Sequence, residues 1–265
     1  MSLFRLFAGL LLLAGFAAGA RADCPRIVSQ SPYLSAALDW FGRADCLVGV
    51  SRYDSRRLPH TGGVRDPDGA AIARLQPDLV IVSRSTGIAE LEMMLPDAAR
   101  LLQVDGLESV DGADAMLLAV GEASRAGDPA GRVETLQHAR RALAGRIGAR
   151  GQRVLVLSAC SALPYSYGRG HYVGDAFVRA GFDVVESAPR LRHLRDGEPI
   201  ASIGQLVETL RPELIVSLNH RDSVACNAEL GQLPVRIVHL TGENFFNPGP
   251  RLLDGYRELM EAMQR

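Results

Sequence analysis

The stretch "RLQPDLVIVSRSTG" at residues 74–87 returns further along the chain as "TLRPELIVSLNHRD" at residues 209–222. Each copy holds the end of a predicted helix, a proline followed by an acid, an apolar run of strand length, and a polar loop. Internal similarity of this kind indicates a chain built from two related halves. The repeat therefore predicts two lobes of similar topology.

Short apolar runs rich in β-branched residues and bounded by turn residues are typical of buried parallel strands. Such runs occur at 26–30, 47–51, 79–83 and 101–104 in the first half, and at 154–158, 183–187, 214–218 and 236–240 in the second. Helical segments alternate with them, as at 31–42, where Ser31 suits the cap and Pro32 the first turn. This alternation predicts an α/β fold in which each lobe has a parallel sheet flanked by helices.

Residues 128–150 lie between the halves and have the pattern of one long helix. Asp128 is a suitable N-cap, Pro129 fits the first turn, and apolar residues then recur at helical spacing. A helix of roughly 20 residues spans about 30 Å, so we expect a rigid rod between the lobes. The expected division is a first lobe at 23–127, this helix, and a second lobe at 151–265.

The first 22 residues have the features of a cleavable secretory signal. Arg5 precedes an apolar run that ends near Ala18, and small residues follow at the positions that signal peptidase requires. The run is too short for a membrane span. We expect cleavage after Ala22 and export of the mature protein to the periplasm; lipid attachment at Cys24 is an alternative that Asp23 disfavours.

All four cysteines follow the signal, and in an oxidising compartment they allow three pairings. Cys24 and Cys46 each precede a predicted strand, so a parallel sheet would bring them to the same edge. Cys160 and Cys226 each follow a strand, at the opposite edge. We therefore predict the disulfides Cys24–Cys46 and Cys160–Cys226; the alternative is free buried thiols, which behave as small apolar residues.

The composition is that of a globular protein, with 47% hydrophobic residues, 22% charged residues and a formal net charge of −1. The lack of a basic surplus argues against a nucleic-acid partner. The sequence contains no lysine, so arginine supplies the positive side chains. Codon bias is the plainer explanation of this composition. Each of these positive side chains is nevertheless a planar guanidinium group, whose donors match the geometry of carboxylate or phosphate.

The polar loops that follow the strands are the candidate binding site, because ligands of open parallel sheets bind outside the carboxyl ends of the strands. These loops combine aromatic and arginine side chains, which suit a large, flat or anionic ligand. The plainer interpretation of any one of these residues is a solvated loop. The candidate ligand-binding residues are Tyr33, Tyr53, Arg56 and Arg84 in the first half, and Tyr167, Arg169, His171, Asn219 and Phe245 in the second.

Enzymatic and bare-metal functions are the alternatives. The glycines at 168–174 lack the spacing of a dinucleotide fingerprint, and neither G-x-S-x-G nor H-E-x-x-H is present, so an exported enzyme has little support. A bare metal site of zinc type is a stronger rival, because His60, His171 and His220 all follow strands, although no carboxylate ligand can be identified. Haem is a further alternative, with Tyr53, Tyr167 or His171 as the iron ligand.

The order of these motifs resembles the periplasmic substrate-binding proteins of ABC importers that have a rigid helix between their lobes. That family serves vitamin B12, ferric siderophores and haem. The residues that carry the resemblance are "RIVSQSP" at 26–32, "LVGVSRY" at 47–53, "ARLQPDLVIVSR" at 73–84, "GHYVGDAFVRAGFDVV" at 170–185 and "PGPRL" at 248–252. The chain departs from the B12 members in having no tryptophan in the loops, since its only tryptophan is Trp40.

The resemblance implies a monomeric, non-enzymatic receptor without a cofactor of its own. Its ligand would be a metal chelate, such as a ferric siderophore or a cobalamin-like cofactor, that it delivers to membrane permease subunits. It also implies that an acid on each lobe docks onto permease arginines: Glu90 on the first lobe, and Asp222 or Glu229 on the second. Paired rim charges of this kind steer encounter and fix orientation, although acids in a first helical turn also simply complement the helix dipole.

Overall fold

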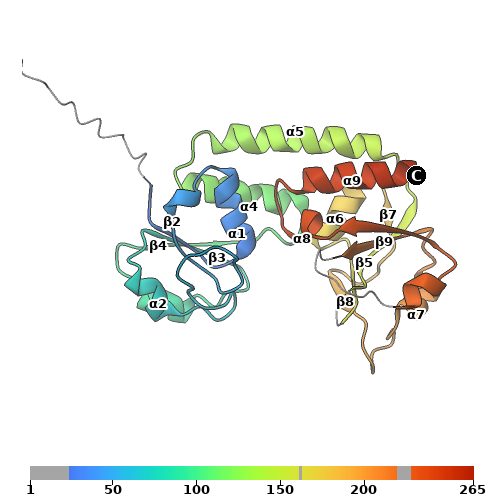
Figure 1. The fold of residues 1–265 in the computed structure, drawn as a ribbon, viewed down its shortest axis with the longest axis horizontal. Helices are drawn as coiled ribbons and strands as arrows, with labels where there is room; N and C mark the ends of the chain where they lie inside the picture. The colour runs from blue at the N-terminus through green and yellow to red at the C-terminus, as the bar shows by residue number, and fades with distance from the viewer. Residues whose placement is uncertain (1–23, 161–162, 220–227) are drawn as a thin grey trace, which may run out of the picture.

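The computed structural model describes residues 24–160, 163–219 and 228–265, which form two α/β lobes (Figure 1). The predicted signal segment, His220, Asp222 and Cys226 lie outside the described residues. Within the described ranges, none of the helices combines the length and the apolar character that a membrane span requires.

The first lobe contains a four-stranded parallel sheet in the order β2-β1-β3-β4. Its strands are β1 (Ile27–Ser29), β2 (Leu47–Val50), β3 (Leu79–Ser83) and β4 (Arg100–Val104), and its helices are α1 (Pro32–Trp40), α2 (Gly69–Arg74) and α3 (Ala89–Met94). Both faces of β3 are buried: Ile81 packs into the cluster that includes α1, and Val80 packs against Ile72 of α2. The strand order reverses between β1 and β3, which leaves a crevice at their carboxyl ends.

The second lobe repeats this order, because its parallel strands run β7-β5-β9-β10. Its strands are β5 (Arg153–Ser158), β6 (Tyr165–Tyr167), β7 (Asp183–Val184), β8 (Leu191–His193), β9 (Leu214–Asn219) and β10 (Arg236–Thr241). Its helices are α6 (Tyr172–Arg179), α7 (Ile203–Leu210), α8 (Glu243–Phe246) and α9 (Leu252–Gln264). The matching orders confirm that the doubled stretch marks two related lobes.

The second sheet contains the predicted parallel strands, but two antiparallel strands that were not predicted make it mixed. Strand β6 is antiparallel to β5, and β8 is antiparallel to β6. The predicted strand at 183–187 shrinks to β7, which pairs only with Arg153 and Val154 at the beginning of β5. The later part of β5 is then free to pair with β6 at Leu157 and Ser158.

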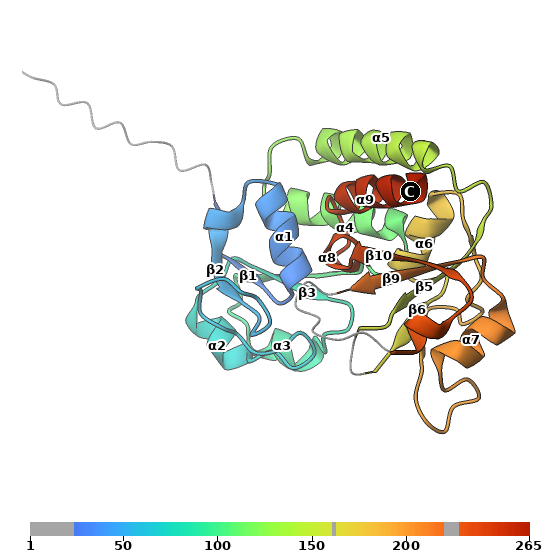
Figure 2. The ribbon, with the colours of Figure 1, turned by 45° about the vertical axis from the view of Figure 1, so that its right-hand side comes forward.

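The predicted linking helix is present as α5 (Pro129–Ile147), which extends over both lobes (Figure 1). Val133 and Leu136 pack into the core of the first lobe, whereas Ala144 and Ile147 pack into the core of the second. Helix α9 lies alongside α5 in two different views (Figures 1 and 2).

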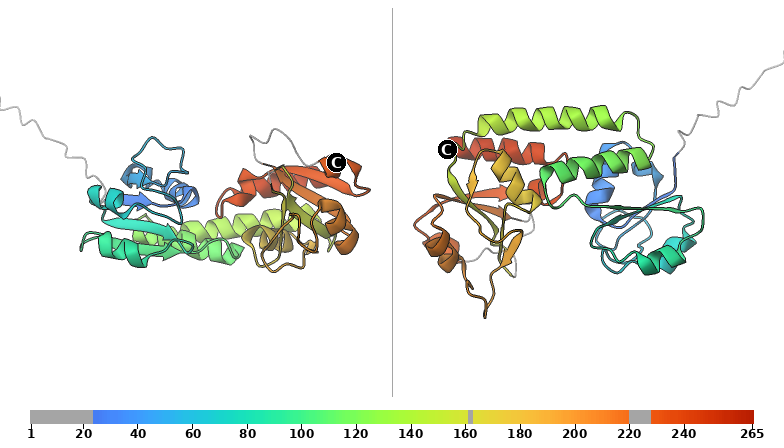
Figure 3. Two further views of the ribbon diagram at one scale, coloured as in Figure 1. Left: turned by 90° about the horizontal axis from the view of Figure 1, so that it is seen from below. Right: turned by 180° about the vertical axis from the view of Figure 1, so that it is seen from behind.

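A second helix, α4 (Val110–Ala123), is also shared by the lobes, and it was not predicted. Figure 3 shows it beneath α5 at the boundary between them. Ala113 near its beginning packs into the core of the second lobe, and Met116 packs into that of the first. The segment before α4 already contacts the second lobe, because Tyr172 N–H donates to the Leu107 carbonyl at 2.9 Å. Between β4 and β5 the chain therefore crosses the boundary three times: after β4, along α4 and along α5.

A buried ion pair joins these two helices. Arg140 of α5 pairs with Asp114 of α4, and the two residues are 6% and 5% exposed. Asp114 follows Ala113 directly, at the point where α4 passes from one core to the other. The pair therefore lies at the lobe boundary.

The predicted disulfide Cys24–Cys46 is confirmed, with its Cα atoms 5.4 Å apart. It fastens the segment before β1 to the 3-10 helix Ala44–Cys46, which directly precedes β2. Cys160 follows β5 as expected, but its proposed partner Cys226 lies outside the described residues, so that pairing stays a prediction.

Candidate functional site

A groove of about 230 Å³ lies where the first sheet reverses its strand order. We call it the interlobe groove, because residues of both lobes line it. Its lining residues are Tyr33, Ser83, Arg84, Ser85, Asp105 and Leu107 from the first-lobe side, and Arg190 from the second lobe. Two of the predicted ligand-binding residues, Tyr33 and Arg84, are therefore brought together.

Two arginines from different lobes meet at one carboxylate beside this groove. Glu108 Oε1 lies 3.2 Å from Arg190 Nη1 and 3.8 Å from Arg84 Nη1. Asp105 Oδ2 lies 3.4 Å from the same nitrogen of Arg84. The side chains of Arg84, Arg190 and Glu108 are 69%, 51% and 50% exposed, so all three are within reach of a ligand.

Tyr33 forms the buried wall of the groove. It lies in the first turn of α1, directly after β1, and is 8% exposed. Burial, and then the negative charge of Asp105, raise the pKa of the Tyr33 phenol above its ordinary value. The phenol therefore stays protonated and can donate a hydrogen bond to a ligand oxygen.

His171 lies next to Arg190 and caps α6. Its Nδ1 accepts a hydrogen bond from Val173 N–H at 3.2 Å. Burial, and then the positive charge of Arg190, lower the pKa of His171 to about 4. The neutral ring that accepts at Nδ1 carries its proton on Nε2, so in this arrangement Nε2 offers no lone pair to a metal.

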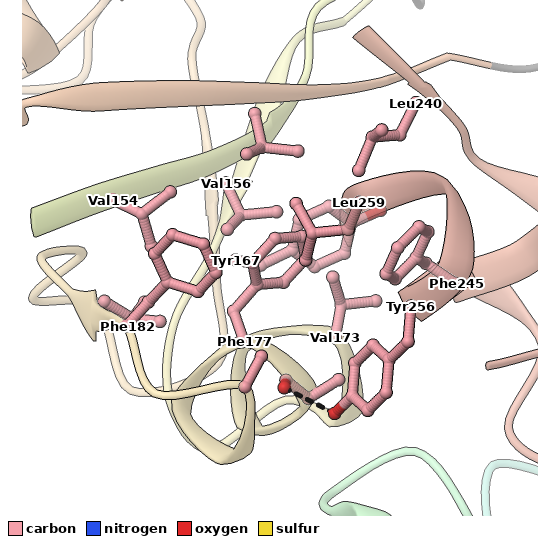
Figure 4. Close-up of a cluster of buried hydrophobic side chains, with 14 of the residues drawn as sticks. Val154, Val156, Tyr167, Val173, Phe177, Phe182, Leu240, Phe245, Tyr256 and Leu259 are labelled. Atoms are coloured by element: carbon pink, nitrogen blue, oxygen red, sulfur yellow. Dashed lines mark hydrogen bonds between the residues drawn. The ribbon is translucent and has the colours of Figure 1, made fainter. Parts of the chain in front are cut away.

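Tyr167 and Phe245 were predicted to contact ligand, but the structure buries both in the core of the second lobe (Figure 4). Tyr167 is 2% exposed, and its hydroxyl donates to Tyr165 Oη at 3.3 Å. Phe245 is fully buried and stacks on Phe177, with 5.4 Å between ring centroids. Its neighbour Phe246 is partly buried instead, since adjacent residues of the short helix α8 point in different directions.

Arg169 and Arg56 are occupied by contacts within the protein. Arg169 pairs with Asp183 and donates to the Val184 carbonyl at 2.9 Å. The antiparallel direction of β6 explains this position, because it carries the following residues back toward the beginning of β5. Arg56 Nη1 donates to both carboxylate oxygens of Asp54, at 2.7 and 2.8 Å, and so stabilises the loop after β2.

The remaining two candidates differ in accessibility. Tyr53 is 63% exposed, with the Arg52 guanidinium 5.4 Å from its ring centroid. Asn219 ends β9, where its Oδ1 accepts from Ser217 Oγ at 2.8 Å and its Nδ2 lies 3.1 Å from His239 Nδ1. Tyr53 is therefore open to a ligand, whereas Asn219 is tied to the sheet.

The acids expected to dock onto a permease have different surroundings. Glu90 is exposed in the first turn of α3 and lines a depression of about 820 Å³ between α2 and α3. Glu229 Oε2 accepts the backbone N–H groups of Ile203 and Gly204 at 2.9 and 3.1 Å. Glu229 thus caps the beginning of α7, which gives it a structural role.

The described residues include no group of three or more His, Cys, Asp or Glu side chains that could hold a metal ion. His60 is exposed after β2, and His220 lies outside those ranges.

Three charged residues beside the groove were not among the predicted ligand-binding residues: Asp105, Glu108 and Arg190. Asp105 directly follows the predicted strand at 101–104. The rule that ligands bind outside the carboxyl ends of parallel strands could therefore have identified it. Glu108 and Arg190 become neighbours only because the chain crosses to the second lobe after β4. Sequence separation alone gives no sign of that contact.

The fold is similar to that of solved two-lobed periplasmic binding proteins. The periplasmic haem-binding protein HutB of Vibrio cholerae superposes with a TM-score of 0.72 at 16% identity, over 91% of this chain and 99% of that chain. The periplasmic vitamin B12-binding protein BtuF of Vibrio cholerae gives 0.70 at 16% identity, over 91% and 97%. The periplasmic haem-binding protein RhuT from Roseiflexus sp. RS-1 gives 0.68 at 22% identity, over 91% and 98%. No family model and no curated protein sequence matches the chain.

Proposed function

We propose that this chain is the periplasmic binding component of an ABC importer, which captures a metal chelate and delivers it to a membrane permease. The observation that carries the proposal is the interlobe groove, where Arg84 and Arg190 approach from different lobes at the reversal of strand order. A ligand held there touches both lobes at once, as a capture protein requires. The proposed activity is binding and release, without catalysis.

The similar structures support this ligand class. They include binding proteins for haem, for vitamin B12 and, in BauB, for a complex of acinetobactin with ferric iron. The apolar segment before residue 23, with small residues ahead of the expected cleavage point, supports delivery to the periplasm.

The size of the groove defines what part of the ligand it holds. Pockets for whole small molecules are about 300–1,000 Å³, and the interlobe groove has about 230 Å³. We infer that it receives a polar arm of the chelate, while the larger body lies over the exposed surfaces beside it.

Haem is a specific candidate within this class because of Tyr53. Of the three iron ligands considered, Tyr167 is buried and His171 uses Nδ1 to cap α6. Tyr53, at 63% exposure, presents its phenol to solvent. A tyrosinate is an established ligand of haem iron.

The test is native mass spectrometry with absorbance spectra of protein purified from its own periplasm. A Soret band would identify haem, a corrin spectrum cobalamin, and a broad charge-transfer band a ferric siderophore. For haem, Tyr53→Phe is expected to shift the Soret band, with Tyr165→Phe as the matched control. A protein that carries none of these and binds neither haemin, cyanocobalamin nor a ferric siderophore in titration overturns the proposal.

The proposed partner is a permease, with Glu90 as a docking residue. Charge reversal at an exposed rim position is expected to slow association while leaving ligand binding unchanged. Transport in reconstituted vesicles at low ionic strength would compare Glu90→Arg with Glu92→Arg, a reversal on the same helix. Equal transport by the two variants and the wild type removes the docking role.

A further inference from the structure

We propose that Glu108 is a specificity-determining residue: its carboxylate holds the place of an anionic group of the ligand between Arg84 and Arg190, and the ligand displaces it. This inference rests on the proposed function and deepens it. It assigns the transported chelate to the carboxylate-bearing class. It also means that the Glu108 carboxylate competes with a carboxylate of the ligand for the two arginines.

The geometry matches that of a bridging ligand oxygen. A single atom, Glu108 Oε1, is shared by the guanidinium groups of Arg190 and Arg84, at 3.2 and 3.8 Å. The two arginines come from different lobes, one before β8 and one after β3. Guanidinium forks are suited to carboxylates, and two of them around one oxygen define an anion position.

Glu108 is held more loosely than the other acid of the cluster. Asp105 Oδ1 accepts from Leu107 N–H at 3.0 Å, and the Asp105 side chain is 24% exposed. Within the described part of the chain, Glu108 pairs only with the two arginines, and its side chain is 50% exposed. Rotation of the Glu108 side chain into solvent therefore frees the anion position without moving the backbone.

The charges explain why this residue selects among ligands. Arg84, Arg190, Asp105 and Glu108 together carry no net charge, so the occupied cluster does not attract anions. When Glu108 rotates away, one positive charge is left between the lobes, and an incoming carboxylate restores neutrality. A ligand without an anionic arm has no means of displacing Glu108 and gains nothing from its removal.

The expected effect is moderate because the pairs are exposed. Ion pairs at such positions contribute little, and salt screens them. Removing the competitor is therefore expected to tighten binding of a small anion by about two- to fivefold at low ionic strength.

The first experiment uses citrate as the probe and the whole mature protein labelled with 15N. The Nε resonances of Arg84 and Arg190 are followed by NMR during titration of the wild type, Glu108→Gln and Glu198→Gln. Glu198 is a matched control, because it loses the same charge from a pair with Arg195 away from the groove. Both arginine resonances are expected to shift together, with tighter binding in Glu108→Gln alone. Equal or weaker citrate binding by Glu108→Gln overturns the proposal.

The second experiment separates this inference from the proposed function. Haemin, which has two carboxylates, is compared with its dimethyl ester, which has none, alongside cyanocobalamin. Tighter binding of haemin but not of the ester by Glu108→Gln supports the inference, and equal changes for both overturn it. If none of these chelates nor a ferric siderophore binds the wild type, the proposed function fails, while the citrate titration still decides the role of Glu108.

Discussion

Arg26 and Arg153 make the same contacts in the two lobes. The backbone N–H of Arg26, just before β1, donates to Asp78 Oδ2 at 2.7 Å. The backbone N–H of Arg153, the first residue of β5, donates to Glu213 Oε2 at 3.1 Å. The acid of each Pro-acid pair thus fastens the strand that begins next to it.

The side chains of these arginines complete the arrangement. Arg26 donates to the carbonyls of Leu75 and Gln76, at 2.8 and 3.1 Å, where α2 ends. Arg153 donates in the same way to the carbonyls of Leu210 and Arg211, at 2.6 and 3.3 Å, where α7 ends. The doubled stretch is therefore a repeated device that joins the end of a helix to the beginning of a central strand.

Removal of either acid is expected to destabilise the protein. Asp78→Ala and Glu213→Ala should each lower the free energy of unfolding by about 1 kcal/mol, since each removes a hydrogen bond to a charged group at an exposed position. Urea unfolding measures the change, and Glu208→Ala, an exposed acid on α7, is the control. If Glu208→Ala lowers stability as much as Glu213→Ala, the contact has no special role.

Breaking the ion pair between α4 and α5 is expected to have a larger effect. Asp114→Ala leaves the Arg140 guanidinium buried without its partner, which should lower the free energy of unfolding by about 3–5 kcal/mol. The double variant Asp114→Leu, Arg140→Met removes both charges and should lose much less. Urea unfolding of the single and double variants tests this, and a double variant no better than Asp114→Ala would contradict the explanation by a stranded charge.

Arg84→Ala and Arg169→Ala are expected to differ in ligand binding. Arg84 lines the interlobe groove but is 69% exposed, so its truncation should weaken binding of a carboxylate-bearing chelate by up to about 1 kcal/mol. Arg169 is paired with Asp183, so Arg169→Ala should bind like the wild type. Fluorescence or absorbance titration gives both affinities. Weakened binding in Arg169→Ala with an unchanged fold would move the binding surface toward β7.

The His171 cap predicts a pH dependence of stability. The pKa of His171 in the folded protein is about 4, below the ordinary 6.5, because of burial and the charge of Arg190. Between pH 4 and pH 6.5 the unfolded state therefore binds more protons than the folded state. The contribution of neutral His171 to the free energy of unfolding is thus complete above about pH 6.5, and it is lost as the pH falls toward 4. The loss at pH 4 should be about 2–3 kcal/mol.

His171→Asn isolates this contribution, because asparagine also caps helices but does not titrate. Urea unfolding at pH 4.5 and pH 7 should show a smaller difference for His171→Asn than for the wild type. An NMR titration in which the imidazole protonates near pH 6.5 would contradict the lowered pKa.

The disulfide Cys24–Cys46 is expected to stabilise the first lobe. It closes a loop with a sequence separation of 22 residues, for which the chain-entropy relation gives about 3 kcal/mol. Thermal unfolding of Cys24→Ala, Cys46→Ala should show this loss without added reductant. The wild type in dithiothreitol should approach the same midpoint, and an unchanged midpoint in the double variant would remove the stabilising role.

The parallel strands could be predicted because burial on both faces gives them continuous apolar runs, as in β3. Strands β6 and β8 could not, because their partners are not visible in the local pattern. Tyr165–Tyr167 has polar Ser166 buried at its centre, where Ser166 pairs with the buried Glu186. A sequence with this polar composition has the appearance of a loop until its long-range contacts are known.

The candidate site was predictable in part for a similar reason. Tyr33 and Arg84 follow strands on either side of the reversal in strand order, so a rule about sheet edges finds them. The same rule locates a loop but not the direction of each side chain, and so it gave no sign that Phe245 and Tyr167 are buried. The contact between Glu108 and Arg190 depends on how the lobes meet, which no local pattern contains.

The sharing of α4 between two cores limits how such a protein can be recombined with its relatives. A chimera cut in the connection between α4 and α5 would give the second lobe a foreign α4, whose Val110 and Ala113 must fit that lobe's own core. It would also separate Asp114 from the arginine with which it is paired. Exchange of binding specificity between relatives is therefore easier by substitution around the groove than by exchange of whole lobes, because neither lobe is a self-contained module.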